Sequence, residues 1–151
     1  MTSYRPVYSL RLVRDRSVAY DTKTTISDPT SVATVAKPLI GDSAVEIVIA
    51  LLLDQRHRLI GLIEIGRGQS DRCMVAIATI ARVALLANAT AIILCHNHPS
   101  GQVDPSNEDR ELTDRVRKGL ALIGIELLDH VIVIESGEFV SLRENYPRLF
   151  E

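Results

Sequence analysis

The feature that most restricts the fold of this chain is an apolar run at residues 45–53, which only Glu46 interrupts. The run consists mainly of β-branched residues and leucine. A run of this composition and length is typical of a central strand that is buried on both faces. We therefore expect other elements to cover both sides of the sheet that contains this strand.

Strand and helix patterns alternate along the rest of the chain. Residues 29–40 are expected to form a helix, because Asp28-Pro29 is a typical helix start and Gly41 a typical end. A segment rich in Ala, Ile and Val at residues 72–86 predicts a second helix that is buried nearly all round. A third helix is expected at residues 107–122, and further strands at residues 7–13, 17–20, 58–65, 91–95, 125–128, 131–134 and 138–142. This alternation predicts an α/β or α+β domain with a mixed sheet.

Length and charge exclude several classes of protein. A chain of 151 residues suits one domain with a core of its own. Two cysteines do not suggest a disulfide framework, and the chain contains neither an apolar signal core nor a run long enough to span a membrane. We therefore expect a cytoplasmic protein. The formal net charge of −2 argues against strong nucleic-acid binding by this chain alone.

The segment from His96 to Asp109 contains the most informative pattern in the sequence. His96 and His98 directly follow a predicted buried strand, and residues two apart in extended backbone point to the same side. A loop containing proline and glycine allows Asp109, in the first turn of the next helix, to return as a third ligand. Imidazole and carboxylate groups suit zinc, and three protein ligands with an open position are typical of a catalytic site. The pattern therefore predicts a Zn²⁺ site at His96, His98 and Asp109, with an open position for water whose pKa zinc lowers to about 7.

Two further residues are candidates for catalysis. Glu46 is a carboxylate within an apolar run, where its burial is costly unless a nearby cation compensates it. It is therefore the candidate general base that accepts a proton from the attacking water. Ser106 is the candidate donor of a hydrogen bond to a developing oxyanion.

Each of these residues also has a structural interpretation. Ser106 and Asp109 form Ser-x-x-Asp, which resembles a helix capping box, and that role is compatible with a metal site. Glu46, on the pattern alone, is better interpreted as an exposed residue at the beginning of a strand. Structural roles are also favoured for the remaining candidates, namely Cys73, Cys95, His57 and the pair Asp129-His130. That pair has two interpretations, a hydrogen-bonding pair at a strand start, which is favoured, or support for the ligands of the metal site.

The spacing His-x-His-Pro, six residues, Ser, two residues, Asp resembles the signature of the JAMM (MPN-plus) zinc metalloproteases. An upstream glutamate completes the site in that family, and Glu46 stands at the matching position. The motif His-Asn-His-Pro-Ser-Gly resembles that of the RadC-like group within this superfamily. Matching segments cover nearly the whole chain, most firmly residues 45–144. The resemblance implies one RadC-like JAMM/MPN domain over residues 1–151, with a mixed sheet flanked by helices and a fold related to the cytidine deaminases.

The chain departs from the RadC-like pattern in two respects. Longer RadC-like proteins carry a helix-hairpin-helix region before this domain, and we expect none in this sequence. The family usually shows Pro-Arg-Glu at the start of the helix before the Ala-Asn-Ala segment, where this chain has Ile77-Ala78-Thr79. If the family's Arg and Glu shape the cleft, substrate choice or activity differs here.

Three functions are consistent with these observations. The resemblance favours a zinc-dependent peptidase or isopeptidase that acts on a peptide or protein substrate. An accessory role in DNA repair, recombination or mobile-element biology rests on the RadC name alone, and a non-catalytic module is disfavoured by the intact site residues. Zinc deaminases use His-x-Glu with Pro-Cys-x-x-Cys, and this chain has neither pattern, so deamination is not expected.

Overall fold

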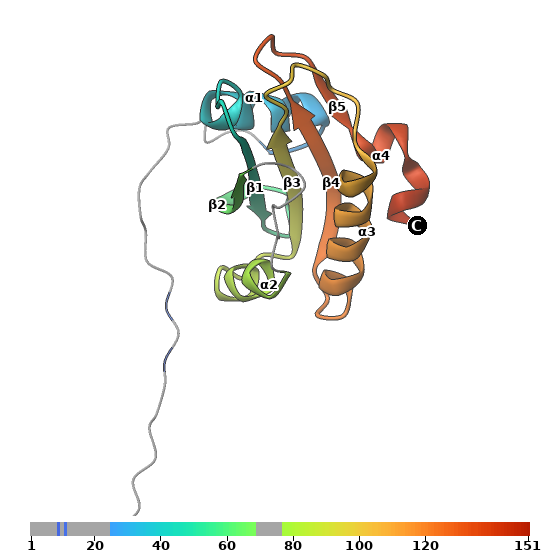
Figure 1. Cartoon of the computed structure of the whole chain (residues 1–151). Helices are drawn as coiled ribbons and strands as arrows, with labels where there is room; N and C mark the ends of the chain where they lie inside the picture. Colours follow the sequence, from blue (N-terminus) through green and yellow to red (C-terminus); the bar gives the residue numbers. More distant parts are fainter. Residues whose placement is uncertain (1–8, 10, 12–24, 69–76) are drawn as a thin grey trace, which may run out of the picture.

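The computed structural model describes residues 9, 11, 25–68 and 77–151 (Figure 1). Apart from Ser9 and Arg11, the predicted strands at residues 7–13 and 17–20 lie outside the described residues, as does Cys73. The elements follow one another as α1 (Pro29–Ile40), β1 (Glu46–Leu53), β2 (Leu59–Gly68), α2 (Ile77–Leu86), β3 (Ala91–Asn97), α3 (Asn107–Ala121), β4 (Glu126–Val133), β5 (Phe139–Ser141), α4 (Leu142–Asn145) and the 3-10 helix η1 (Pro147–Phe150).

The described strands form a five-stranded sheet in the order β2-β1-β3-β4-β5. β3 and β4 are parallel, whereas the other neighbouring pairs are antiparallel. The predicted mixed sheet is therefore confirmed. β1 lies inside the sheet and all eight of its residues are buried, as expected from the apolar run.

Helices cover both faces of this sheet (Figure 1). Successive side chains of a strand point to opposite faces, and β1 shows this plainly. Ile47, Ile49 and Leu51 pack with α1 in one cluster, while Val48 and Ala50 pack with α2 and α3 in the other. This alternation places Glu46, the first residue of β1, on the face that carries α2 and α3.

Several predicted elements differ from the observed ones, and β2 continues to Gly68, three residues beyond its expected end. The separate strands expected at 125–128 and 131–134 are one continuous strand, β4. Its pairing with β3 continues past a register shift at Leu128, because Asp129 and His130 both find hydrogen-bond partners. The expected burial of the second helix on all sides was wrong, because only Ile80 and Ala84 of α2 are fully buried and Leu85 is 54% exposed. β3 continues two residues beyond Cys95 and thus includes His96.

The start of α1 follows the prediction. Asp28 caps the helix by accepting a hydrogen bond from the N–H of Ser31 at 2.8 Å, and Pro29 is the first helical residue. Asp28 satisfies a free donor of the first turn, and Pro29 has no N–H that would need a partner there. Among the described helices, none has the length and apolarity that crossing a bilayer requires.

Candidate metal centre

The two histidines of the His-x-His pattern meet at the carboxyl end of β3. His96 is fully buried and lies on the face covered by α2 and α3, while His98 lies one residue beyond the strand. Their Nε2 atoms are 2.9 Å apart. The other ring nitrogen of His98, Nδ1, lies 2.6 Å from the carbonyl oxygen of Gln102. That contact orients the His98 ring so that its Nε2 atom faces His96.

Asp109 brings a carboxylate to the same point from the first turn of α3. Its Oδ1 lies 3.2 Å from His96 Nε2 and its Oδ2 lies 3.5 Å from His98 Nε2. Burial alone raises the pKa of Asp109, but hydrogen bonds from His96, His98 and Ser106 outweigh it and hold the pKa well below its usual value. The carboxylate is therefore ionised and available as a ligand.

The geometry of these three side chains fits a metal ion. Each offers one ligand atom, and the three atoms lie within 4.8 Å of one another. Two ligands about 2.0–2.1 Å from a tetrahedral zinc ion stand about 3.3–3.4 Å apart. The two Nε2 atoms are 2.9 Å apart, and each lies at a similar distance from the Asp109 carboxylate, His96 at 3.2 Å from Oδ1 and His98 at 3.5 Å from Oδ2. His96, His98 and Asp109, which we call the triad, are thus brought together as the sequence predicted.

Ser106 caps the N-terminus of α3 and, in doing so, holds the Asp109 carboxylate of the triad in place. Its hydroxyl accepts a hydrogen bond from the N–H of Asp109 at 3.0 Å and donates one to Asp109 Oδ2 at 2.7 Å. The backbone N–H of Ser106 also donates to Oδ2, at 2.8 Å. The capping-box interpretation is therefore correct, and it is compatible with the metal site because the cap fixes the ligand carboxylate.

A second row of polar side chains supports the triad. Support of the site was the less favoured of two interpretations of His130 from the sequence, whereas the part played by Thr113 was not predicted. His96 Nδ1 lies 2.7 Å from His130 Nε2, and His130 Nδ1 lies 2.6 Å from the hydroxyl of Thr113. Thr113 in turn donates to the backbone carbonyl of Asp109 at 2.6 Å. When His96 Nε2 faces a metal, its Nδ1 carries the proton and donates to His130, which fixes the ring. This chain of hydrogen bonds links β3, β4 and α3 behind the triad.

His130 must be uncharged to play this part. Burial, together with the nearby charge of His96, lowers the pKa of His130 well below its usual value. A structural role was the favoured interpretation of His130, and its contact with His96 makes that interpretation incomplete. In the parallel ladder His130 pairs with Leu94, and its side chain reaches His96, which is two residues further along β3 on the same face of the sheet.

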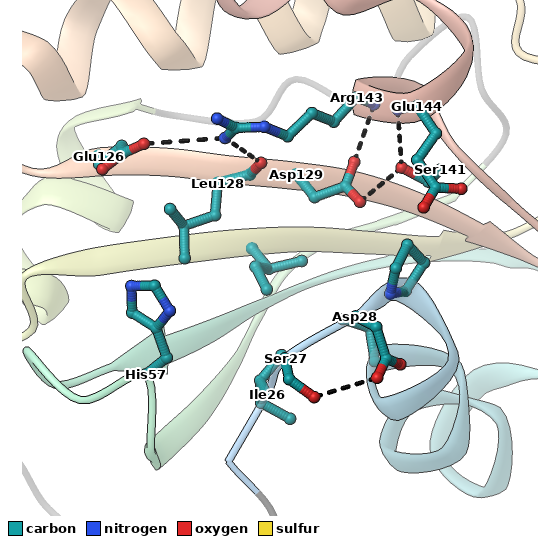
Figure 2. A pocket seen from close by; sticks show the side chains of 13 residues that line it. Ile26, Ser27, Asp28, His57, Glu126, Leu128, Asp129, Ser141, Arg143 and Glu144 are labelled. Atoms are coloured by element: carbon teal, nitrogen blue, oxygen red, sulfur yellow. Dashed lines mark hydrogen bonds and ion pairs between the residues drawn. The ribbon is translucent and has the colours of Figure 1, made fainter.

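Asp129, the neighbour of His130, points to the opposite face of the sheet. Its carboxylate accepts hydrogen bonds from the hydroxyl of Ser141 at 2.6 Å and from the N–H of Arg143 at 3.0 Å (Figure 2). It lines a hollow of about 430 Å³ next to α1. The structural interpretation of Asp129 is therefore correct, since it ties β4 to β5 and α4. This hollow lies across the sheet from the triad and is not part of the metal centre.

Glu46 is buried beside the triad. Its exposed fraction is only 8%, so the alternative of an exposed residue at a strand start was wrong. Burial raises the pKa of Glu46, and the charge of Asp109 adds to this, whereas His96 and His98 act in the opposite direction. The triad and Glu46 therefore influence one another electrostatically, as expected of groups that share a site.

Cys95 precedes His96 but is not part of the site. It is fully buried on the α1 face, and burial, followed by the nearby charge of Asp129, raises the pKa of its thiol. The predicted core role of Cys95 is therefore correct.

We expect Cys95 to resist alkylation in the folded protein, because the reactive thiolate is both inaccessible and disfavoured. Mass spectrometry of the Cys95 peptide after iodoacetamide treatment should find it unmodified in the native protein and modified after unfolding in guanidinium. Equal modification of this peptide under both conditions would show that the strand end is open to solvent.

Comparisons with known proteins agree with this arrangement. The family model described as the RadC-like JAB domain matches residues 26–147. A UPF0758 protein of Halorhodospira halophila is 43% identical over 120 residues, which cover 80% of this chain and 53% of that protein. The protein Bcen2424_2501 of Burkholderia cenocepacia, also a UPF0758 protein, is 39% identical over 148 residues, which cover 93% of this chain and 58% of that protein.

This chain therefore spans little more than half the length of these curated relatives. The matched residues contain the triad and Glu46, and the sheet between helices is consistent with a JAB/MPN-like fold. A cluster of two histidines and an aspartate within this family fits a metal-dependent hydrolase. The chain belongs to the RadC-like JAB domain family.

Proposed function

We propose that the domain is a zinc-dependent peptidase or isopeptidase that uses Glu46 as its general base. The observation that carries this proposal is the buried carboxylate of Glu46 beside three converging ligand atoms from His96, His98 and Asp109. A structural zinc site needs four protein ligands and no base. Three ligands with an additional carboxylate nearby favour hydrolysis over a purely structural role.

The choice of zinc follows from the donor set. Imidazole nitrogen and one carboxylate oxygen suit zinc, whereas calcium and magnesium prefer oxygen ligands alone. A zinc ion at this position would polarise a substrate carbonyl and lower the pKa of water. His96, His98 and Asp109 would hold the ion, and His130 and Thr113 would keep the His96 ring in its orientation.

Glu46 would accept the proton of the attacking water and then deliver it to the leaving amine. A carboxylate with an ordinary pKa is a weak base near neutral pH, and a raised pKa improves proton transfer. Burial supplies that rise at Glu46. An amide or isopeptide bond needs both steps, since its amine leaves only after protonation.

Ser106 would help by donating a hydrogen bond to the oxyanion that forms at the substrate carbonyl. Its hydroxyl currently donates to Asp109 Oδ2, so this role requires the hydroxyl to rotate toward the substrate. The backbone N–H of Ser106, which also donates to Asp109 Oδ2, would then maintain the hydrogen bonding at the start of α3.

Ser106→Ala separates the two roles of this residue. We expect the variant to keep its metal and to lose about 1 kcal/mol of stability with the cap. If the hydroxyl also stabilises the oxyanion, hydrolysis should fall by about 10²–10³-fold. Thermal denaturation, metal analysis and a rate measured well below the melting temperature test these points together. A rate equal to that of the wild type would confine Ser106 to the cap.

The peptidase proposal itself is tested by a cleavage screen. The purified domain, loaded with one equivalent of zinc, is incubated with a peptide library that includes isopeptide-linked lysines, and products are identified by mass spectrometry. We expect cleavage of a subset of amide bonds by the wild type and none above background by Glu46→Gln. Identical product patterns from both proteins, or no cleavage of any member, would contradict the proposal.

A further inference from the structure

We propose that Asn97, the residue between the two histidines of the triad, is a positioning residue that clamps the backbone on both sides of Glu46. The proposal deepens the proposed function, on which it rests, because it assigns Asn97 a part in holding the general base. Asn97 is fully buried, and the role proposed for it concerns β1, not the metal.

The side-chain hydrogen bonds of Asn97 lie directly beyond the point where the pairing of β1 with β3 ends. The last paired residues of these antiparallel strands are Val48 and His96. One step further, Ile47 would stand opposite Asn97, but the side chain of Asn97 takes the place of a backbone partner. Its Oδ1 accepts a hydrogen bond from the N–H of Ile47 at 2.7 Å. The side chain thus extends the ladder past its final pair.

The same amide group reaches the other side of Glu46. Its Nδ2 donates to the carbonyl oxygen of Val45 at 3.1 Å and to that of Ser43 at 3.2 Å. The amide oxygen and both amide hydrogens of Asn97 therefore bind the five-residue segment 43–47, in which Glu46 lies between two of the three partners. An aspartate lacks the donors, and a serine offers only one, so an asparagine suits this position best.

Glu46 needs such a clamp because it is the first residue of its strand. On the β2 side its backbone is opposite Gly68, the last residue of β2. On the β3 side it has no partner in the ladder. Strand ends open readily, and a buried carboxylate gains hydration when its segment opens. The amide of Asn97 opposes this opening from the β3 side.

Asn97 also couples the base to the metal ligands. In β3 the side chain of His96 points to the α3 face, and that of Asn97 points to the α1 face. One short segment therefore provides two ligands, His96 and His98, and the clamp for the base. Catalytic groups must keep their relative positions to within about 0.5 Å, and a shared backbone segment supplies that constraint.

The test compares Asn97→Ala and Asn97→Ser with Asn145→Ala. The control removes another side-chain amide that donates to a backbone carbonyl, that of Ser141, far from the triad in sequence and in α4. Hydrogen exchange of the metal-free proteins should be at least tenfold faster at the amide of Ile47 in both Asn97 variants and unchanged there in the control. If Asn97→Ala does not fold, Asn97→Ser carries the test, because its hydroxyl retains part of the hydrogen bonding.

The rate measurement shows whether catalysis depends on the clamp. With zinc bound at one equivalent, we expect kcat to fall by about 10–100-fold, as for other supporting residues of metal sites, with KM nearly unchanged. Asn97→Ala should add little to the loss caused by Glu46→Gln, because the clamp acts through Glu46. Unchanged exchange at Ile47, a wild-type kcat in both variants, or losses that multiply in the double variant would each overturn the proposal. If the wild type itself cleaves nothing, the proposed function fails, while the exchange result still decides whether the clamp exists.

Discussion

Glu46→Gln is expected to lower peptide hydrolysis by at least about 10²-fold, and by up to about 10⁴-fold, while the protein retains its metal. Glutamine keeps the size and the hydrogen-bonding shape of the side chain but cannot accept a proton at neutral pH. Glu46 lies beside the triad and is not one of its ligands. The loss should therefore appear in the rate and not in the metal content.

Thermal stability should change little in this variant, or increase slightly. Burial raises the pKa of Glu46, which means that the site disfavours the charged form in the absence of a metal. A neutral amide removes that cost. Differential scanning calorimetry of the metal-free proteins measures this directly.

Glu126→Gln is the matched control, since Glu126 is also the first residue of a strand but is exposed. It should hydrolyse the substrate at the wild-type rate. If Glu46→Gln does the same, Glu46 is not the base. If Glu46→Gln instead loses its zinc, Glu46 is a ligand and its assigned role is wrong.

Asp109→Ala is expected to abolish stable metal binding and, with it, hydrolysis. The variant removes the negatively charged ligand and leaves two neutral imidazoles, which bind a dication far more weakly. Elemental analysis should find about one equivalent of zinc in the wild type, as for a single three-ligand site, and only a trace in the variant. His96→Ala should have the same effect and should also destabilise the fold, because it leaves Nε2 of buried His130 without a hydrogen-bond partner.

Asp114→Ala controls for a general effect of altering α3. Asp114 lies on the same helix and pairs with Lys118 at 2.6 Å on the surface. The control should keep its metal, and the metal-free wild type should remain folded, because a domain of this size has its own core. Full zinc occupancy in Asp109→Ala would rule out the triad.

The sequence was most informative where one physical constraint dominates. The apolar run at residues 45–53 required a strand covered on both faces, and β1 is such a strand. The spacing of His96, His98 and Asp109 reflects the geometry of one ion, and their ligand atoms converge. In both cases the constraint is local, so a single sequence is sufficient.

The burial of individual side chains and their hydrogen-bond partners were harder to predict from the sequence, because both depend on segments that are distant in the chain. The burial of Glu46 depends on neighbouring strands, and the first of these, β2, comes later in the chain. The Asp129-His130 pair resembled a break between two strands, yet Ser141 and Arg143 satisfy Asp129 and His96 contacts His130. The role of Asn97 was hidden for the same reason, since its three partners lie about fifty positions earlier.

The most direct test of the metal centre is reversible removal of the metal from the wild type. The protein is treated with a chelator until elemental analysis finds no zinc, assayed against the peptide identified in the cleavage screen, and then titrated with zinc. Hydrolysis should disappear with the metal and return in proportion to occupancy, reaching its full value at about one equivalent per chain. Full activity in verified metal-free protein would contradict the account.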